Sequence, residues 1–549
     1  MVSCRRRRAH REHDAGATIT PRRAGRNAHA GAVQSAAIRS DNARLVPSNN
    51  KIYDLLVVGA GINGAGIARD AAGRGLSVLL IDKDDIAAAT SQWSTKLIHG
   101  GLRYLEHYEF RLVRESLIER EVLLRHAPHL VQPMTFVLPH EPHLRPAWMI
   151  RAGLFLYDHL GHRELLHASF GVDLAAGKWG AGLKPRFDRG FAYADARVDD
   201  ARLVVAIARD ASERGAEIRV GTRLVGARRA GAHWIATFAA ADGARSETTT
   251  RAIANAAGPW VQVVRDMLGS APSRERVRHV KGSHIVVPRV HDGDHAYLLQ
   301  NADNRVVFVI PFLGRYSLIG TTDVPVDEYE HPHISEQEID YLLALANAYL
   351  AQPLSRADIV WTYSGVRPLY DDGRSDPSAI TRDYVLKLDA VQGLAPTLSV
   401  YGGKLTTYRR LAEHAVDELA RFFPDAGRCW TRDAPLPGGD LPPGGLDAWR
   451  DEMQRRYAAL PSDIVRGIAQ RHGTRATKVL ADARTVVGLG EVFGNDLAAA
   501  EVDYLVRNEW ARSADDVLWR RTKAGLGMSD AGRARVDAYV RKAVAAAQA

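Results

Sequence analysis

A glycine-rich turn at residues 59–64 (GAGING) constrains the fold of this chain more than any other feature. It follows a short apolar run at 53–58 that suits a buried parallel strand, and it precedes small residues at 65–73 that suit a helix. A second apolar run ends at Asp82, 18 residues after Gly64. Such glycines permit a tight turn and close approach to a pyrophosphate, and the Asp82 carboxylate can accept a ribose hydroxyl. The pattern predicts a Rossmann-like dinucleotide site.

Three later segments favour FAD over NAD as the dinucleotide. Residues 90–96 (TSQWSTK) gather hydroxyls and amides that can follow a pyrophosphate and a ribityl chain, although an ordinary polar loop has the same composition. Residues 253–258 look like another strand that ends in small residues beside the phosphate. Residues 402–407 lead into a helix whose N-terminus can stabilise the negative charge of a reduced flavin. A nucleotide site divided between both ends of the chain suits a long cofactor, so we predict FAD.

The remaining sequence predicts a second sheet and a helical region. Strand-like runs at 283–287, 306–312 and 317–320 indicate a sheet outside the nucleotide-binding unit. An amphipathic helix is expected near 109–126. The stretch at 435–446, rich in proline and glycine, is the clearest linker.

The predicted fold class is α/β, with a Rossmann-like FAD-binding domain of glutathione-reductase type, a mixed-sheet substrate domain and a C-terminal all-α domain. Within 51–434 the FAD-binding domain interleaves with the substrate-binding domain. We assign 51–130, 190–270 and 360–425 to the first and 131–189 and 271–359 to the second, followed by the linker at 435–446 and the C-terminal domain at 447–549. The C-terminal domain can cover the flavin domain, build a dimer interface or contact a membrane, and its sequence does not decide among these roles.

The formal net charge of +9 is concentrated in the first 50 residues. These contain ten Arg and three acidic residues, a net of +7, so the remaining 499 residues carry 63 basic and 61 acidic groups, a net of +2. This nearly neutral body argues against nucleic acid as a partner. We expect residues 1–50 to be a disordered Arg-rich tail. Three explanations compete: a targeting segment, a nucleic-acid or lipid arm, and translated sequence upstream of the true start, which we prefer.

The two cysteines, Cys4 and Cys429, offer neither a disulfide framework nor a Cys-based metal site, and we expect no metal site elsewhere.

Seven motifs stand in order along the chain. They are 59–66 (GAGINGAG), 94–107 (STKLIHGGLRYLEH), 281–288 (KGSHIVVP), 320–323 (GTTD), 361–368 (WTYSGVRP), 381–384 (TRDY) and 402–408 (GGKLTTY). Together they resemble the motifs of one family, the aerobic FAD-dependent glycerol-3-phosphate dehydrogenases. The resemblance runs from about residue 53 to about residue 530. It implies oxidation of sn-glycerol 3-phosphate to dihydroxyacetone phosphate, by hydride transfer from C2 to flavin N5 with electrons passed to membrane quinone. It also implies a cytoplasmic homodimer attached peripherally to the inner face of the cytoplasmic membrane.

The resemblance implies substrate-binding residues whose chemistry suits a phosphate dianion. Such an anion calls for several cationic, forked donors. We predict that the substrate is bound by Arg103, Tyr104, His284, Arg367, Arg382 and Lys404. For each arginine the competing explanation is a solvated or structural ion pair, because arginine is abundant in this chain.

Alcohol oxidation requires a base for the hydroxyl proton, and a neutral histidine suits that task. We predict His284 as the base or as an alcohol-positioning residue, and we expect the turn at 100–101 to place His99 beside the isoalloxazine. Arg367 is expected to clamp phosphate or orient the alcohol, while Lys404 can act on flavin or substrate. The predicted catalytic residues are therefore His284, His99, Arg367 and Lys404.

The residues expected to bind FAD lie in or beside the glycine turn, the hydroxyl-rich loop, the later strand and the segment before the last helix. They are Gly59, Gly61, Ile62, Asn63, Gly64, Asp82, Thr90, Ser91, Ser94, Thr95, Lys96, His99, Gly100, Gly101, Ala257, Gly258, Trp260, Gly365, Arg367, Gly403, Lys404, Leu405, Thr406 and Thr407.

Membrane contact and competing functions complete the sequence-based expectations. No apolar run approaches the roughly 18 to 20 residues of a membrane-spanning helix. The segment 145–157 mixes bulky apolar residues with Arg145 and Arg151, as an interfacial helix does, and a core helix explains it about as well.

An oxygen-dependent glycerophosphate oxidase and an FAD-dependent amine or hydroxy-acid oxidase are the competing enzymes. A flavin-containing RNA-binding protein would need a basic folded body, which this sequence lacks.

Overall fold

The computed structural model describes residues 45–46 and 51–548, except 142, 144, 270–275, 302, 304 and 372–382. The predicted substrate ligand Arg382 and most of the predicted tail lie outside the described residues. Within the tail, β1 (Leu45–Val46) pairs in parallel with β11 (Arg245–Asn255), so this short part of it takes part in a sheet.

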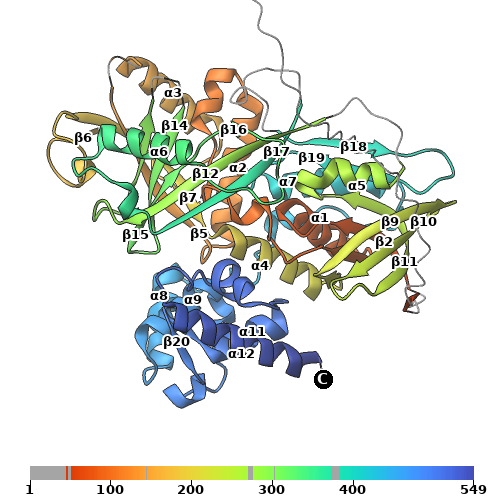
Figure 1. Cartoon of the computed structure of the whole chain (residues 1–549). Coiled ribbons are helices and arrows are strands. Elements are labelled where there is room, and N and C mark those ends of the chain that lie inside the picture. Colours follow the sequence, from red (N-terminus) through yellow and green to blue (C-terminus); the bar gives the residue numbers. More distant parts are fainter. Residues whose placement is uncertain are drawn as a thin grey trace, which may run out of the picture. The chain divides into compact units, whose positions relative to one another are not determined.

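A mostly parallel sheet carries the nucleotide-binding unit (Figure 1). Besides β11, its strands are β2 (Ile52–Val58), β3 (Val78–Ile81), β8 (Glu217–Arg219), β9 (Thr222–Ala230), β10 (His233–Ala240), β18 (Val385–Asp389) and β19 (Thr397–Tyr401). The main order is β18-β19-β11-β2-β3-β8, parallel from β19 to β8, with β18 antiparallel at the edge. The helices that pack on it are α1 (Ile62–Gly73), α4 (Asp200–Glu213), α5 (Val261–Met267) and α7 (Tyr408–Ala420).

Apolar side chains of β2 alternate between two cores on opposite faces of this sheet. Leu55 and Val57 pack under α1, α4 and α7. Leu56 and Val58 pack under the β9–β10 hairpin and α5. Burial on both faces explains the continuous apolar run in the sequence. The layering also sets the N-terminus of α1 at the carboxyl edge of the sheet, where parallel α/β sheets bind ligands.

The second sheet is mixed, as predicted. Its strands are β4 (Leu97–Ile98), β5 (Val131–Pro139), β6 (Phe170–Asp173), β7 (Arg189–Val198), β12 (Val277–Pro288), β13 (Ala296–Gln300), β14 (Val306–Phe312), β15 (Tyr316–Gly320), β16 (Val324–Pro325) and β17 (Trp361–Tyr370). The main order is β16-β12-β15-β14-β13-β5-β7-β4, in which β13 and β5 run parallel. One face is covered by α2 (Phe110–His126) and α3 (Ala147–Leu160), and the other by α6 (Glu336–Tyr349).

Most predicted elements of this sheet fall where the sequence patterns put them. The three strand-like runs lie in β12, β14 and β15, and the amphipathic helix is α2. Three memberships differ from the expected segments: β4, β7 and β17 belong to this sheet, although 51–130, 190–270 and 360–425 are assigned above to the FAD-binding domain. An apolar strand pattern does not specify which sheet a strand joins, so this difference depends on pairing alone.

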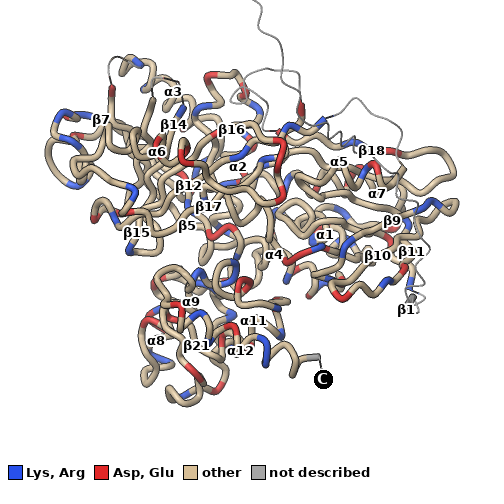
Figure 2. The backbone as a smooth tube through the Cα atoms, in the orientation of Figure 1, with Lys and Arg blue, Asp and Glu red and all other residues tan. Residues whose placement is uncertain are grey.

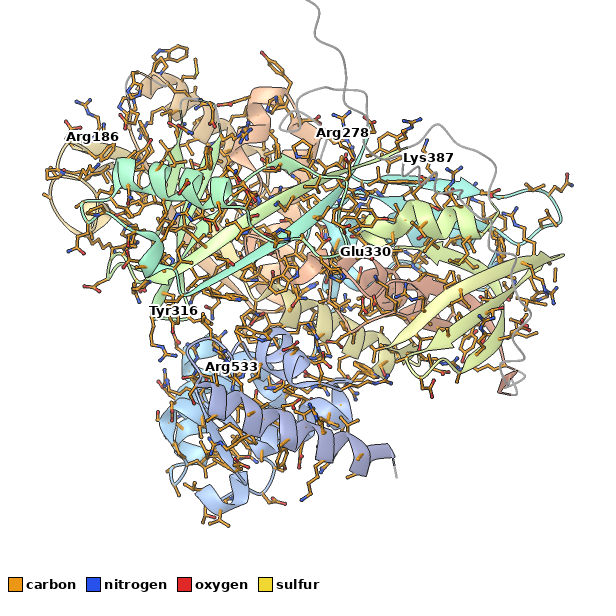
Figure 3. The ribbon with its side chains drawn as sticks, viewed as in Figure 1. Arg186, Arg278, Tyr316, Glu330, Lys387 and Arg533 are labelled. Atoms are coloured by element: carbon orange, nitrogen blue, oxygen red, sulfur yellow. The ribbon has the colours of Figure 1, made fainter. Side chains whose placement is uncertain are left out.

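The C-terminal region is helical as predicted, with one short hairpin added. Its elements are α8 (Gly445–Arg456), α9 (Ser462–His472), α10 (Ala476–Leu480), β20 (Val492–Gly494), β21 (Leu497–Ala498), α11 (Ala499–Asn508) and α12 (Asp530–Gln548). They share their own apolar core. Tyr316, at the start of β15, lies beside this region (Figure 3), where Arg315 donates to the Asn495 side-chain oxygen at 3.4 Å. Figure 2 shows basic and acidic positions intermixed along the described chain.

Short helical turns join these elements. They are η1 (Thr90–Gln92), η2 (Leu102–His107), η3 (Lys178–Gly180), η4 (Gly258–Trp260), η5 (Arg356–Asp358), η6 (Thr431–Asp433), η7 (Gly473–Arg475), η8 (Val486–Leu489) and the π-helical η9 (Asp516–Arg521). The turn η9 reaches the nucleotide-binding unit, because Arg521 Nη2 lies 2.8 Å from Asp85 Oδ1 in the loop after β3. The adjacent Arg520 Nε lies 2.6 Å from Asp85 Oδ2. The C-terminal region therefore contacts the loop that follows Asp82.

Candidate active site

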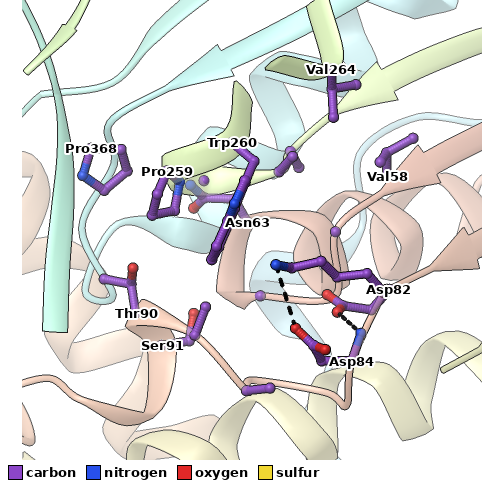
Figure 4. Close-up of a pocket in the computed structure, with 18 of the residues that line it drawn as sticks. Val58, Asn63, Asp82, Asp84, Thr90, Ser91, Pro259, Trp260, Val264 and Pro368 are labelled. Atoms are coloured by element: carbon purple, nitrogen blue, oxygen red, sulfur yellow. Dashed lines mark hydrogen bonds and ion pairs between the residues drawn. The ribbon is translucent and has the colours of Figure 1, made fainter. Parts of the chain in front are cut away.

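The first cavity lies where β2 ends and α1 begins (Figure 4). From the glycine turn its lining takes Gly59, Gly61, Ile62 and Asn63. Gly59 has a φ of 103°, and a Cβ there would lie 2.6 Å from the Ala256 carbonyl oxygen. A Cβ on Gly64, in the first turn of α1, would lie 1.8 Å from the Gly59 oxygen. These approaches require glycine, and they keep the turn close under the N-terminus of α1, as an anion site demands.

Asp82 follows β3 and faces the same cavity. Its carboxylate accepts a hydrogen bond from the backbone N–H of Ala60 at 2.7 Å. It accepts another from the backbone N–H of Asp84 at 2.9 Å (Figure 4). Burial raises the pKa of Asp82 to about 6. A carboxylate has further lone pairs, so Asp82 can still accept a hydrogen bond from a ribose hydroxyl.

Thr90 and Ser91 lie across the cavity from Asp82 (Figure 4). The Ser91 hydroxyl accepts a hydrogen bond from the Ile62 N–H at 3.0 Å. The Thr90 hydroxyl donates to the Val366 carbonyl oxygen of β17 at 2.6 Å. The loop that the sequence left open as an ordinary polar segment is therefore fixed to α1 and β17 beside the cavity.

The segment after β11 forms another wall. It contributes Ala257, Gly258 and Trp260 to the lining. The Lys83 ammonium lies 3.8 Å from the centroid of the Trp260 ring, and the Trp260 indole donates to the Glu330 carboxylate at 3.0 Å. These contacts hold the indole at the edge of the cavity.

The turn before α7 joins the first cavity to a second one. Gly402 and Gly403 line both, with φ values of 70° and 99°. The Asn63 side-chain amide donates to the Gly402 carbonyl oxygen at 3.0 Å. Leu405 and Thr406 continue into the second cavity. Segments from the two ends of the folded chain therefore meet at one site, as the division of the nucleotide-binding motifs predicted.

The second cavity brings together most of the predicted substrate and catalytic residues. The segments before and after β4, strand β17 and the turn before α7 supply Ser94, Thr95, His99, Gly101, Arg103, Tyr104, Gly365, Arg367 and Lys404. Of the predicted site residues that the structure describes, the following line neither cavity: Gly64, Lys96, Gly100, His284 and Thr407.

Two cations of the second cavity, Arg367 and Lys404, lie against neighbouring side chains. Arg367 Nη1 lies 2.6 Å from an Asp323 carboxylate oxygen, and its Nη2 donates to the Thr321 hydroxyl at 3.2 Å. The Lys404 ammonium lies 3.9 Å from the centroid of the Tyr104 ring. Both positive groups are therefore positioned at the cavity wall before any anion binds.

The two predicted histidines take different places. His99 lines the second cavity, and burial with the nearby charges of Lys404 and Arg120 lowers its pKa to about 3. His284 lies behind the wall, with its Nε2 3.0 Å from the Thr95 hydroxyl and its ring stacked on Tyr363. Burial lowers the pKa of His284 well below its ordinary value. Both imidazoles are therefore neutral at pH 7, and only His99 reaches the cavity directly.

Lys96 and Ser94 face α4. The Lys96 ammonium lies 2.9 Å from both carboxylate oxygens of Asp200, and the Ser94 hydroxyl donates to Asp200 at 2.7 Å. Their contact with FAD stays a prediction, while their observed partner anchors the loop that carries Thr95 and His99.

The sequence did not assign several residues of the second cavity to the active site. They include Glu106, Leu138, Arg145, Tyr193, Leu298, Gln300, Phe308, Thr321 and Asp323. Arg145 forms a two-point pair with Glu106 at 2.7 and 3.0 Å. The GTTD motif could have indicated Thr321 and Asp323, whereas the apolar residues face the cavity only because of the strand register in the second sheet.

Comparison with known proteins gives matches along almost the whole described chain. A family described as "FAD dependent oxidoreductase" matches residues 54–409, and one described as "C-terminal domain of alpha-glycerophosphate oxidase" matches residues 429–546. The glycerol-3-phosphate dehydrogenase of Pseudomonas aeruginosa is 52% identical over 495 residues, which are 89% of this chain and 95% of that protein. The D-erythritol 1-phosphate dehydrogenase of Brucella abortus is 50% identical over 483 residues, 88% of this chain and 96% of that protein.

A solved structure agrees with these matches. The glycerol-3-phosphate dehydrogenase of Bacillus halodurans complexed with FAD has a TM-score of 0.67 and 25% identity, covering 90% of this chain and 95% of that one. Because the match covers 90% of this chain, the α/β fold with its C-terminal helical domain agrees with that of the solved structure.

Proposed function

This chain belongs to the family of FAD-dependent glycerol-3-phosphate dehydrogenases, and from that premise we propose that it oxidises sn-glycerol 3-phosphate to dihydroxyacetone phosphate. The observation that carries the proposal is the second cavity, where His99 meets the cationic side chains of Arg103, Arg367 and Lys404. FAD is the cofactor, and when bound it supplies the acceptor for the hydride of the alcohol carbon. The glycine cradle fits it, because the N-terminus of α1 and the Asp82 carboxylate suit a pyrophosphate and a ribose.

The cationic side chains favour a phosphate over a carboxylate substrate. Arg367 is oriented by Asp323 and Thr321, so its planar guanidinium is pre-organised for two-point binding. Arg103 and Lys404 add positive charge at the same cavity. A dianion uses several such groups, whereas a single carboxylate needs fewer. Their gathering supports a phosphorylated alcohol against an amino acid.

The alcohol proton requires a neutral acceptor at the cavity. His99 meets this condition by its place at the cavity, and its lowered pKa keeps the imidazole neutral at pH 7. His284 would act on the alcohol through Thr95, whose hydroxyl it contacts. We propose that His99 holds the proton and that His284 orients Thr95. Single-turnover flavin reduction across pH by His99→Asn and His284→Asn tests this, and a larger rate loss in the His284 variant would restore His284 as the base.

Anaerobic flavin reduction tests the substrate. We expect sn-glycerol 3-phosphate to bleach the flavin absorbance and glycine to leave it unchanged. D-erythritol 1-phosphate belongs in the same experiment, because a relative that is 50% identical carries that substrate in its name. Bleaching by erythritol phosphate alone would move the assignment to longer polyol phosphates, the second candidate, and bleaching by glycine alone would refute both.

The electron acceptor is a separate part of the proposal. We propose membrane quinone, with oxygen as the alternative that an alpha-glycerophosphate oxidase match keeps open. Mixing the reduced enzyme with a soluble quinone or with oxygen measures both reoxidation rates, and faster reoxidation by oxygen would overturn the quinone assignment. We also propose the homodimer, which light scattering of the purified holoenzyme tests.

Helix α3 supports peripheral attachment to the inner face of the cytoplasmic membrane. Its buried face carries Ile150 and Leu154, while Trp148 and Phe155 are 69% and 66% exposed, beside the exposed cation Arg151. The sequence allowed either an interfacial helix or a core helix at 145–157. The buried face of α3 has the character of a core helix, and its exposed face has the character of an interfacial one. An exposed apolar face with nearby cations suits the surface of an anionic bilayer. Among the residues that the structure describes, no helix is long and apolar enough to cross a membrane.

Vesicle flotation tests this surface. The holoenzyme is mixed with vesicles of phosphatidylglycerol and phosphatidylethanolamine. We expect Trp148→Ser with Phe155→Ser to lower the floated fraction several-fold. Val487→Ser is the matched control, since this apolar residue of the C-terminal region is 89% exposed. Equal flotation of the double variant and wild type would remove α3 from the proposal.

A further inference from the structure

A buried polar cluster lies behind the turn that carries His99. The Gly100 N–H donates to the Tyr157 hydroxyl oxygen at 2.8 Å and lies 3.4 Å from an Asp195 oxygen. The Tyr157 hydroxyl donates to the Asp195 carboxylate, at 2.9 and 2.8 Å from its two oxygens. Arg120 Nη1 donates to the same carboxylate at 2.6 Å. We call Arg120, Tyr157 and Asp195 the turn-support cluster.

The cluster is assembled from three separate elements. Arg120 belongs to α2, Tyr157 to α3 and Asp195 to β7. Their exposed fractions are 3%, 3% and 2%, and none of them lines the second cavity. The cluster therefore has no direct contact with a substrate bound there, and it can act on the reaction only through the turn.

Stability alone is a poor explanation for this cluster. Removing a carboxylate and a guanidinium from water opposes the gain from pairing them, and well-packed apolar residues of similar volume serve about as well. The feature that apolar residues could not supply is an acceptor for the Gly100 N–H. A buried N–H without an acceptor is costly, so the polar cluster specifies where this turn lies.

The turn is confined on both sides. A Cβ on Gly100 would lie 2.5 Å from a Leu117 methyl carbon and 2.6 Å from the Tyr157 oxygen. On the cavity side, the His99 N–H donates to the Thr406 hydroxyl at 3.2 Å. The turn thus lies between the cluster and the segment before α7. Any displacement of Tyr157 reaches His99 through a single glycine.

We propose that Tyr157, Asp195 and Arg120 are positioning residues that fix His99 against the segment before α7. The proposal rests on the proposed function for the part His99 takes in the reaction, whereas the packing it describes requires no substrate. Tyr157 also lies on the buried face of α3, whose outer face we propose to dock on a membrane. The cluster therefore connects that helix to the active-site turn.

The variant Tyr157→Phe removes one hydroxyl and keeps the ring. Tyr457→Phe is the matched control, because Tyr457 is as deeply buried and its hydroxyl donates to the Ala481 carbonyl oxygen at 3.1 Å in the C-terminal region. Both holoenzymes are compared with wild type by hydrogen exchange of peptides covering the turn, by FAD content and by single-turnover flavin reduction. The exchange measurement needs no substrate, so it decides the inference even if sn-glycerol 3-phosphate fails to reduce the flavin.

We expect Tyr157→Phe to retain FAD, to exchange the turn amides roughly tenfold faster and to reduce its flavin roughly tenfold more slowly at saturating substrate, with KM within about threefold of wild type. Tyr457→Phe should match wild type in exchange at the turn and in rate. Unchanged turn exchange in Tyr157→Phe, or equally faster exchange throughout the protein, would overturn the proposal.

A second variant checks the charged half of the cluster. Asp195→Asn keeps the volume and leaves Arg120 with the more distant Glu121 carboxylate, 3.5 Å from its Nη2. The carboxylate that accepts hydrogen bonds from Tyr157 and from the Gly100 N–H becomes a neutral amide. The turn amides should therefore exchange faster in Asp195→Asn than in wild type, and its flavin should be reduced more slowly while FAD is retained. Turn exchange at the wild-type rate in a folded Asp195→Asn enzyme would remove Asp195 and Arg120 from the proposal.

Discussion

Replacing Gly64 by alanine should separate FAD binding from folding. The new Cβ would lie 1.8 Å from the Gly59 carbonyl oxygen, and such contacts essentially never fall under 3.0 Å, so helix and turn must part by at least 3.0 − 1.8 = 1.2 Å. A hydrogen bond of about 2.9 Å lengthened by that amount is lost. Each hydrogen bond to a charged group contributes about 1.5–3 kcal/mol. Loss of one pyrophosphate contact therefore weakens FAD binding roughly 10- to 150-fold.

The assay is titration of apoprotein with FAD, followed by quenching of flavin fluorescence. Gly153→Ala is the control, because Gly153 also lies in a helix and a Cβ there has nothing within 4 Å. Both substitutions gain the same intrinsic helix propensity, about 1 kcal/mol. We expect Gly153→Ala to bind FAD with near wild-type affinity and Gly64→Ala to bind it more weakly. A folded Gly64→Ala protein that binds FAD within threefold of wild type would refute the steric reasoning.

Three further predictions concern the substrate site, acid stability and the C-terminal region. Arg367→Lys should raise KM for sn-glycerol 3-phosphate about tenfold or more, since an ammonium cannot bind phosphate at two points, and steady-state kinetics would contradict this by an unchanged KM. The pKa of His99 is about 3 in the folded protein and near its ordinary value of 6.5 in the unfolded chain. Between these two pH values the unfolded state binds more protons, so the urea midpoint of unfolding should fall as the pH drops below 6.5. In His99→Asn the urea midpoint should fall less steeply with pH than in wild type. Parallel curves for the two proteins would disprove the lowered pKa of His99. Arg521→Met removes one of the two cations beside the buried Asp85 carboxylate, so it should lower the free energy of unfolding by about 3 kcal/mol in the first urea transition. Removing the exposed pair of Arg466 with Asp451 should lower it by less than about 1 kcal/mol. Equal losses from the two changes would argue against a buried contact.

The role of the C-terminal region becomes more specific with the structure. The sequence left three roles open, and the contacts of Arg520 and Arg521 with Asp85 bring this region against the loop after Asp82. Lys523 pairs with Asp199 at the start of α4. These contacts support a role in holding the cofactor-binding loops, and they leave dimer and membrane contacts to the experiments above.

The sequence by itself determined the local features of the nucleotide site. The glycine turn, the apolar strands beside it and Asp82 are set by short-range patterns, because turn geometry and buried strands impose residue types over a few neighbouring positions. The helix expected near 109–126 and the strands at 283–287 and 306–312 follow from the same periodicities, and the structure confirms them. The long motifs likewise indicated the family, which the comparisons confirm.

Only the tertiary structure decided which distant residues meet. Lys96 contacts Asp200 and not an open cavity, and His284 lies behind Thr95, although both stand in motifs that suggested direct contact with ligands. The support of Gly100 by residues of three other elements is equally invisible in sequence, since no spacing links positions so far apart. Side-chain partners of this kind follow from sheet order and helix packing, so they appear only once the two sheets and their covering helices are assembled.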